Sequence, residues 1–258
     1  MALIKTSEEI EKMREGGALL SRALNAAIDV VRVGVAICDL DAAAEKTILA
    51  GGGEPSFKGY RTSKHTPPFP STLCVSVNEE VVHGLGNRSR TLKEGDLVGL
   101  DIGCWYKGLC TDMAVTVPVG KVSLEATKLM QVTRESMEAG VRAAVVGNEI
   151  KDIGVAVEAI VKPHGYGIVR ALVGHGVGHA VHEDPHVPNY VDGRAPYVPI
   201  VNGMCLAIEP MIGLGDYPVT TADDGWAVLM ADGSIGAHFE VTVVCLKGGT
   251  EILTPLPI

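Results

Sequence analysis

Apolar positions at the opening of the chain recur with the period of an α-helix. Thr6 and Glu9 stand in the order of a capping box, so we expect a helix to begin beside them. The apolar positions that follow at helical spacing are Ile10, Met13, Leu20, Leu24 and Ile28. A second helix is expected after residues 33–40 and should end near Ala50.

Two strand-like runs come next, over residues 72–82 and 96–117. The second run is apolar at both ends and turn-like in its middle, at residues 105–108, which predicts a β-hairpin. Each arm of this hairpin carries an aspartate among apolar neighbours, Asp101 in the first arm and Asp112 in the second.

The position of the turn decides how these two aspartates meet. If the turn centres between Tyr106 and Lys107, Asp101 lies directly opposite Asp112, and such pairs have Cβ atoms roughly 5 Å apart. Carboxylates this close in apolar surroundings cannot both stay ionised unless a cation holds them. The pair is therefore expected to be a metal clamp or a dyad that shares one proton.

The second half of the chain repeats the pattern of the first. Helix signals begin near Ser123 and again over residues 146–153, and strand-like runs follow. In both halves an acidic residue ends an apolar run, six residues after a glycine; these residues are Asp101 and Glu209. The shared register of the acids indicates a duplicated unit with one site between its two copies.

A second hairpin is expected near the end of the chain. It would run from residues 226–230 through an Asp232-Gly233 turn into residues 235–246, which carry Glu240. A strict two-residue turn there would pair Gly225 with Glu240. Together these elements predict an α+β fold with two α-α-β-β halves around a central antiparallel sheet in one domain. The halves span about residues 1–120 and 121–258.

Composition narrows the setting in which the protein works. The chain has 258 residues, of which 47% are hydrophobic and 21% charged, as in ordinary globular proteins. A net charge of −9 makes nucleic acid and anionic membranes unexpected partners. The six cysteines contain no Cys-x-x-Cys pair, the start is no secretory signal, and no apolar run is long enough for a membrane span. We expect a cytoplasmic protein with reduced thiols, and a monomer by default.

A glycine-rich histidine segment supplies the remaining chemistry. Glycines on both sides of His175 and at Gly178 argue against a helix, so His175 and His179 are not the paired histidines of an HExxH zinc protease. Four carboxylates and one imidazole suit two divalent ions, with Asp112 and Glu240 as bridges. This candidate ligand set is Asp101, Asp112, His175, Glu209 and Glu240.

Each of these residues also has a purely structural interpretation. Asp101 and Glu209 fit it least, because a lone carboxylate inside an apolar strand is costly. Glu240 and His179 stay open, and a lone His83 or Trp226 is more often a packed residue than part of a site. The other histidines are expected to be structural: His65, His164, His186 and His238.

The order of these residues resembles the pita-bread metallohydrolases and, within them, the type I methionine aminopeptidases. The similarity covers nearly the whole chain. The motifs that carry it are Val75-Ser-Val-Asn78, Gly174-His-Gly-Val-Gly178, His182-Glu-Asp-Pro185, Ile208-Glu-Pro-Met211 and Asp224-Gly-Trp226. The resemblance implies a pita-bread fold and an enzyme that removes the initiator methionine of nascent proteins with water activated by two metal ions. Cobalt, manganese, iron and zinc all suit the donors. Work close to the ribosome would follow from that substrate.

The resemblance also implies roles for individual residues. His182 matches the histidine that stabilises the oxyanion, and His83 the histidine near the scissile amide nitrogen. Glu209 matches the carboxylate that passes a proton from water to the leaving amine. His182 would contact the substrate, and the residues expected around the methionine side chain are Tyr60, Cys74, His83 and Trp226.

Some positions depart from the family pattern. Val241 follows Glu240 where the family usually has histidine, Val181 replaces a common aromatic residue, and Phe57 replaces a small one. Residues 61–70 form a proline-rich loop that is longer than usual. Three other functions stay open: a prolidase-like or aminopeptidase P-like peptidase on the same site, a hydrolase of non-peptide C–N bonds, and a binding protein without activity.

Overall fold

Of the four predicted helices, the second begins earlier than expected, at Ile37 instead of after Leu40, and the other three begin near their predicted positions. The computed structural model describes residues 4–64, 66–194 and 196–257. The long helices in these ranges are α1 (Ser7–Ile28), α2 (Ile37–Ala50), α3 (Leu124–Ala143) and α4 (Ile150–Val161). The Thr6 hydroxyl accepts a hydrogen bond from the Glu9 amide, and the Glu9 carboxylate accepts one from the Thr6 amide. The predicted capping box is therefore confirmed. None of the described helices is long and apolar enough to cross a membrane.

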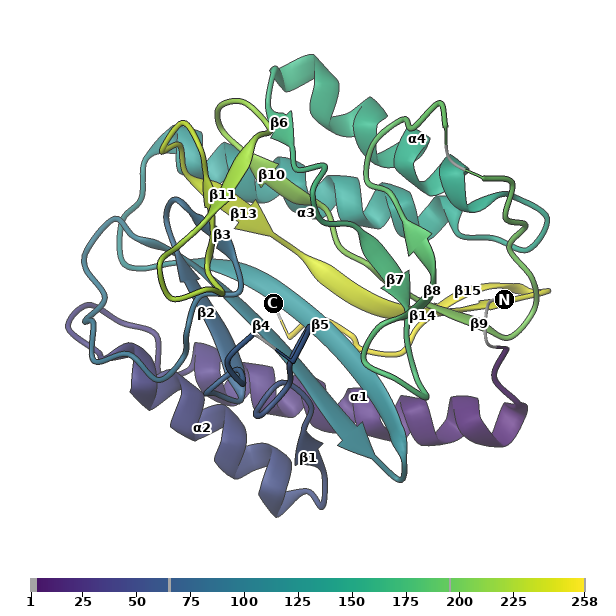
Figure 1. The fold of residues 1–258 in the computed structure, drawn as a ribbon, viewed down its shortest axis with the longest axis horizontal. Helices are drawn as coiled ribbons and strands as arrows, with labels where there is room; N and C mark the ends of the chain where they lie inside the picture. Colours follow the sequence, from purple (N-terminus) through teal and green to yellow (C-terminus); the bar gives the residue numbers. More distant parts are fainter. Residues whose placement is uncertain (1–3, 65, 195, 258) are drawn as a thin grey trace.

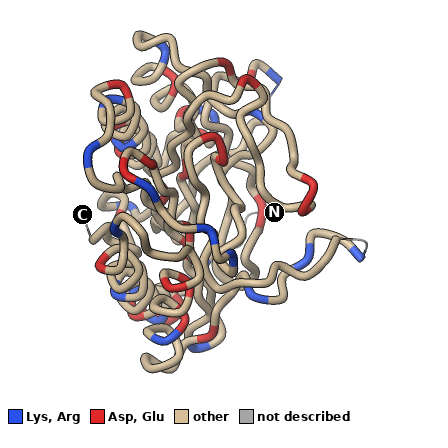
Figure 2. The backbone as a smooth tube through the Cα atoms, turned by 90° about the vertical axis from the view of Figure 1, so that its left-hand side faces the viewer, with Lys and Arg blue, Asp and Glu red and all other residues tan. Residues whose placement is uncertain are grey.

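A curved antiparallel sheet occupies the centre of the molecule, and the long helices gather on one side of it (Figures 1 and 2). Its strands follow the order β1–β4–β5–β14–β9–β7–β8, with β2 beside β4 and β15 beside β14. The strands are β1 (Glu54–Pro55), β2 (Leu73–Val77), β4 (Leu97–Tyr106), β5 (Leu109–Pro118), β7 (Gly174–Gly176), β8 (Glu183–Val187), β9 (Met204–Ile208), β14 (Glu240–Leu246) and β15 (Gly249–Ile252). Because β5 pairs with β14, the two halves of the chain join in the middle of the sheet. The predicted α+β class is confirmed.

The hairpin of β4 and β5 is present, but its predicted register is wrong. The turn is Lys107-Gly108, one residue later than expected, and both residues have positive φ (51° and 82°) as a type I′ turn requires. Asp101 therefore pairs with Ala114 instead of Asp112. The shift leaves the two aspartates as diagonal neighbours on the same face of the hairpin, since side chains alternate with period two.

The second predicted hairpin is wrong, because its two arms join different small sheets. β12 (Val228–Met230) pairs with β11 (Val219–Thr221) and β3 (Glu80–Val82), whereas β13 (Gly236–His238) pairs with β10 (Met211–Gly213), which also pairs with β6 (Gly167–Ile168). The expected pairing of Gly225 with Glu240 does not occur within the described strands.

Local hydrogen bonds explain why that hairpin does not close. The predicted turn exists, since the Gly233 amide donates to the Met230 carbonyl. However, the Asp232 carboxylate accepts hydrogen bonds from the amides of Ser234 and of Asp216, at 2.9 and 2.8 Å. The second bond ties the turn to a neighbouring loop, and the chain leaves it toward β10 instead of returning along β12.

Candidate metal centre

The sheet places the acidic side chains of both halves on one face. Ala114 of β5 pairs with Asp101 of β4 on one side and with Glu240 of β14 on the other. Asp112 lies two residues before Ala114 in the same strand. Directly opposed residues and residues two apart point to the same face of a sheet, so these three carboxylates project together.

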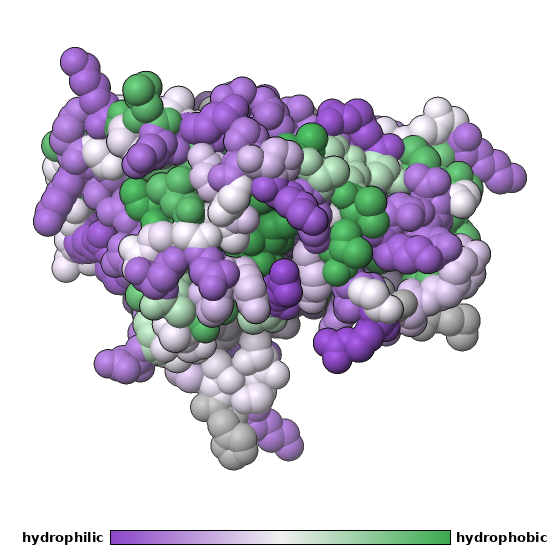
Figure 3. Space-filling model, turned by 90° about the horizontal axis from the view of Figure 1, so that it is seen from above, coloured by the Kyte–Doolittle hydropathy of each residue, from purple (hydrophilic) through white to green (hydrophobic). Residues whose placement is uncertain are grey.

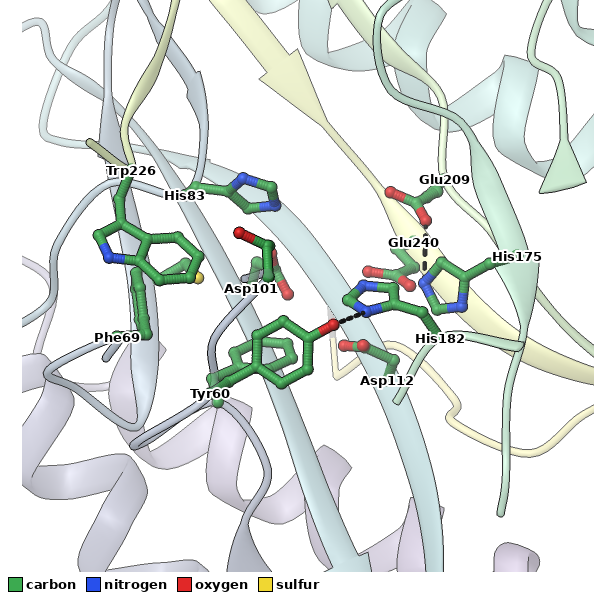
Figure 4. A pocket seen from close by; sticks show the side chains of 13 residues that line it. Tyr60, Phe69, His83, Asp101, Asp112, His175, His182, Glu209, Trp226 and Glu240 are labelled. Atoms are coloured by element: carbon green, nitrogen blue, oxygen red, sulfur yellow. Dashed lines mark hydrogen bonds and ion pairs between the residues drawn. The ribbon is translucent and has the colours of Figure 1, made fainter. Parts of the chain in front are cut away.

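The same rule brings in the remaining candidate ligands. Ala207 of β9 pairs with Thr242, two residues after Glu240, and with His175 of β7. Glu209 follows Ala207 by two residues. His175 and Glu209 therefore extend the row of carboxylates across β9 and β7, and Figure 4 shows all five side chains converging.

These side chains line one pocket together with every residue that the sequence placed near the substrate. The lining residues are Phe57, Tyr60, Thr62, Phe69, Cys74, His83, Asp101, Asp112, His175, His182, Glu209, Trp226 and Glu240. One end of the pocket is acidic and the other aromatic. The roles assigned to these residues stay predictions, but the structure brings the residues together.

The His175 imidazole is oriented as a metal ligand needs to be. Its Nδ1 lies 2.8 Å from the Gly176 carbonyl oxygen, which only accepts, so Nδ1 carries the proton. Nε2, with its free lone pair, faces the carboxylates and lies 3.3 Å from Glu209 Oε1. Burial lowers the pKa of His175 to about 3, which keeps the ring neutral. A neutral imidazole fixed through its other nitrogen is the form that binds metals.

The carboxylates of the cluster are too close and too buried to stay charged by themselves. Burial raises the pKa of Asp101 to about 7. Burial and, next, the charge of Asp101 raise the pKa values of Asp112 and Glu209. Burial and then the charge of Asp112 raise that of Glu240. Asp101, Asp112 and Glu240 each hold one buried oxygen without a hydrogen-bond partner among the described residues. Such a cluster requires protons or cations, and its donors suit divalent metal ions.

His238 lies in this cluster, contrary to its predicted structural role. Its side chain is 3% exposed, and its Nε2 is 3.7 Å from Glu209 Oε2 and 3.9 Å from Glu240 Oε2. Burial lowers the pKa of His238 to about 3. Its position two residues before Glu240 is only a weak signal, because two such side chains share a face only where the chain between them stays extended.

His182 is held by a neighbour that the sequence did not connect to it. The Tyr60 hydroxyl lies 2.8 Å from His182 Nδ1, and the two rings meet edge to face (Figure 4). The His182 ring also packs against that of His175, with ring centroids 4.4 Å apart. Burial lowers the pKa of His182. The site therefore holds a neutral imidazole beside the ligand cluster.

The far end of the pocket is built by the proline-rich loop. Phe69 packs edge-on against Trp226, with ring centroids 5.2 Å apart, and the Trp226 Nε1–H donates to the Pro67 carbonyl at 3.1 Å. Trp226, which the resemblance placed around the methionine side chain, thus lines the pocket. The sequence missed the contribution of Phe69, although an aromatic residue between prolines near a pocket mouth was a usable signal.

The other histidines divide between the site and the surface. His83 follows β3 with φ of 59°, and burial, then the charge of His182, lowers its pKa to about 4. His179 is half-exposed, and its Nε2 lies 2.7 Å from the Glu9 carboxylate. His164 and His186 are exposed, and their structural role stays a prediction. His65 lies outside the described residues.

Comparisons with known proteins agree with this geometry. Residues 11–247 match the sequence model of metallopeptidase family M24. The chain is similar to the methionine aminopeptidase of Clostridium acetobutylicum, with 45% identity over 98% of this chain and 99% of the relative. It is also similar to methionine aminopeptidase 1 of Bacillus subtilis, with 40% identity over 98% and 99% of the two chains.

Solved structures lead to the same group. The methionine aminopeptidase of Thermotoga maritima has a TM-score of 0.93 and 39% identity, covering 98% of this chain and 99% of that chain. A prolidase from Pyrococcus furiosus aligns with a TM-score of 0.78 at 24% identity. The alignment covers 100% of this chain and 66% of the prolidase, which shows a shared fold. The predicted pita-bread fold is confirmed by these likenesses.

Proposed function

The chain belongs to metallopeptidase family M24, and we propose how its residues carry out the reaction of this enzyme. That reaction is removal of the N-terminal methionine of new proteins and peptides. The observation that carries the proposal is one pocket with buried carboxylates and an imidazole at one end and aromatic side chains at the other. The prolidase-like function is not favoured, because curated methionine aminopeptidases match nearly the whole chain at 37–45% identity, whereas the prolidase from Pyrococcus furiosus shares only 24%. We further propose one catalytic domain, with halves near residues 1–120 and 121–258 that meet where β5 pairs with β14.

The protein binds divalent metal, and we propose two ions. The residues that would hold them are Asp101, Asp112, His175, Glu209 and Glu240, with Asp112 and Glu240 shared between the ions. These donors accommodate cobalt, manganese, iron or zinc, so they do not select one metal. When bound, the ions would polarise the substrate carbonyl and lower the pKa of a water molecule.

The aromatic end of the pocket suits the methionine side chain. Phe69 and Trp226 meet edge to face there, and Cys74 adds a buried thiol. A thioether chain is slender and polarisable and packs well against aromatic rings. The cationic α-amine of the substrate would lie toward the carboxylates, which explains removal of a single residue from the amino terminus.

Tyr60 and His182 together would present a proton to the scissile carbonyl. A phenol is a stronger acid than a neutral imidazole, so we assign the hydroxyl of Tyr60 as donor to His182 Nδ1. The proton of the neutral ring then sits on Nε2, where it can donate to the carbonyl oxygen as negative charge develops. The opposite tautomer would leave Nε2 without a proton to donate.

Glu209 is the proposed proton carrier. It directly follows β9 and faces the pocket beside His175 (Figure 4). Its carboxylate would accept a proton from the attacking water and deliver it to the leaving amine nitrogen. His83, on the pocket wall, would contact the same nitrogen.

The test is release of free methionine from Met-Ala-Ser and Met-Gly peptides by metal-stripped protein titrated with Co²⁺, Mn²⁺ or Fe²⁺. Metal-dependent release that Asp112→Ala abolishes would support both the reaction and the site. Cleavage of Xaa-Pro peptides instead would favour the prolidase-like function. No release from folded protein with any metal would defeat the proposal and favour a binding role.

The cellular setting is also a proposal. All six cysteines lie in the described ranges and are free, which suits a reducing compartment such as the cytoplasm. We propose a monomer that acts on chains emerging from the ribosome. Sedimentation of the pure protein would test the first part, and co-sedimentation with ribosomes that carry nascent chains the second.

A further inference from the structure

We propose that His238 supplies a second imidazole to the metal centre, as a donor beyond the five residues of the family pattern. The proposal rests on the metal site of the proposed function. Nε2 of His238 lies 3.7 Å from one Glu209 oxygen and 3.9 Å from one Glu240 oxygen, deep inside the protein.

These separations fit ligands of a common ion and do not fit hydrogen bonds. An N–H···O hydrogen bond spans about 2.7–3.2 Å. Ligand atoms about 2.1 Å from one ion stand roughly 3.4 Å apart in a tetrahedral site and never more than about 4.2 Å. His175 Nε2, an expected ligand, lies 3.3 Å from Glu209 Oε1. The contacts of His238 Nε2 belong to the same range of distances.

The ring nitrogen also needs a partner. His238 Nε2 is buried and has no hydrogen-bond partner among the described residues. A buried polar atom in a folded protein is normally satisfied, and an orphan one commonly marks an unseen ion or water. The nitrogen faces carboxylate oxygens that themselves require a cation, so an ion between them would satisfy all three groups.

The backbone fixes His238 on the site side of the chain. Its amide donates to the Thr116 hydroxyl, which donates in turn to the His238 carbonyl, both at 2.9 Å. His238 also pairs with Met211 of β10. Side chains alternate along the extended chain, so Val241 points into the core while the imidazole stays with Glu240.

The donors form two groups that share one residue. Asp112, His175 and Glu240 offer ligand atoms within 4.8 Å of one another, and so do Glu209, His238 and Glu240. Each group contains one imidazole, and Glu240 is common to both. A second nitrogen donor would favour cobalt, iron or zinc over manganese, which prefers carboxylate oxygens.

The number of metal-bound imidazoles can be counted directly. In the Co²⁺-loaded protein, a ligated histidine gives a strongly shifted proton NMR signal from its ring N–H, and this signal disappears in D₂O. We expect two such signals from the wild-type protein and one from His238→Gln. The variant should also bind Co²⁺ at least about tenfold more weakly, with a smaller loss for Mn²⁺.

Controls keep this result interpretable. His164→Gln removes an exposed histidine that stacks on Tyr166 and is not among the lining residues of the pocket, so it should keep both signals and the Co²⁺ affinity. His238→Asn serves if the glutamine variant does not fold. One exchangeable signal from wild-type protein with its site filled would overturn the proposal without any variant. Unchanged signals and affinity in folded His238→Gln would do the same, while methionine release by the wild type would still stand.

Discussion

Two neighbouring imidazoles of the site, His175 and His182, have different partners at Nδ1, a carbonyl oxygen and a phenol hydroxyl. The Gly176 carbonyl can only accept, so His175 holds its proton on Nδ1 and turns a lone pair toward the carboxylates. With the Tyr60 hydroxyl assigned as the donor, as proposed above, His182 would hold its proton on Nε2. In this proposal, identical side chains with ring centroids 4.4 Å apart serve as a metal ligand and as a hydrogen-bond donor.

Replacing Tyr60 by phenylalanine should weaken His182 as a hydrogen-bond donor, while the ring at position 60 still lines the pocket. Without the phenol donor, the imidazole is free to take either tautomer, so the donor to the carbonyl is partly lost. We expect kcat to fall by about 10- to 100-fold with little change in KM, since a whole oxyanion donor is worth roughly 100- to 1000-fold. Nitrogen-15 NMR of labelled histidine should show Nδ1 of His182 becoming partly protonated.

Phe69→Leu is the matched control for that variant. It alters the apolar end of the pocket and leaves the bond between Tyr60 and His182 in place. It should raise KM and leave the nitrogen-15 shifts of His182 unchanged. If Tyr60→Phe raised KM only, Tyr60 would be a wall of the pocket and not a positioning residue.

Among single residues, the sequence best predicted site residues that differ in chemistry from their immediate neighbours. Asp101 and Glu209 interrupt apolar strands, and His175 stands between glycines. His238 gave a weaker signal, because Phe239 separates two short strands that join different sheets, and alternation across that break cannot be read from the sequence. The contact between Tyr60 and His182 joins segments far apart in the chain, so no local sequence pattern predicts it.

At the scale of elements, the start of α1 supports the histidine segment. Lys5 forms a buried ion pair with Glu183 at 2.5 Å, and the Glu183 carboxylate accepts hydrogen bonds from the amides of His179 and Ala180. Glu9, in the first turn of α1, reaches the His179 ring. The amino-terminal helix therefore fixes the loop from which His182 projects.

The contribution of Glu9 to the stability of the fold should depend on pH. Its hydrogen bonds with the Thr6 amide and then with His179 lower its pKa from 4.5 to about 2. A lowered carboxyl pKa stabilises the fold above pH 4.5, and that contribution is lost as pH falls toward 2. Glu9→Gln should therefore cost about 1 kcal/mol in urea unfolding near pH 6, and the deficit should shrink near pH 3.

A different acid on the same helix is the control for Glu9. Glu8→Gln, in the same first turn, leaves the capping box intact and should lose little at either pH. An equal deficit for Glu9→Gln at both pH values would mean that its charge does not matter.

Gly17 sets how closely α1 approaches the end of the chain. A Cβ atom there would lie 1.9 Å from the Leu253 carbonyl oxygen, whereas one at Gly16 would lie 3.1 Å from the Tyr106 Cβ atom. Gly17→Ala should therefore destabilise the protein by about 1–3 kcal/mol in urea unfolding. Gly16→Ala should stay within about 1 kcal/mol of wild type, because alanine is the better helix former. Equal effects would argue against the close contact.

Elements were predictable where their signals are local. Thr6 and Ser123 mark helix starts through their own hydrogen bonds, and both predictions are confirmed. The turn of the β4–β5 hairpin was placed one residue early, because a lysine at positive φ, as at Lys107, is uncommon. The Asp232-Gly233 turn was right, but its long-range bond to Asp216 redirected the strands.

For the whole molecule, the site is also the joint between the halves. β5 and β14 pair directly at only two positions, of which one is Glu240 with Ala114, beside the carboxylate cluster. Elsewhere, hydrophobic groups on the face shown in Figure 3 occur in patches separated by hydrophilic residues, and acidic and basic residues alternate over the helices in Figure 2. The buried carboxylates whose charges raise one another's pKa values thus lie where the two halves pair.

Removing the metal should consequently destabilise the whole protein. Ions that bind the folded state at about 100 times Kd add about 2.7 kcal/mol, so stripping them should lower Tm by roughly 5–10 °C. Asp112→Asn keeps the size of the side chain but removes one buried charge where the two halves pair. This variant should be at least as stable as the metal-free wild type and should gain little Tm when Co²⁺ or Mn²⁺ is added. A full metal-induced rise in the variant would place the stabilising ion elsewhere, because a centre that bridges the halves through Asp112 cannot form without that carboxylate.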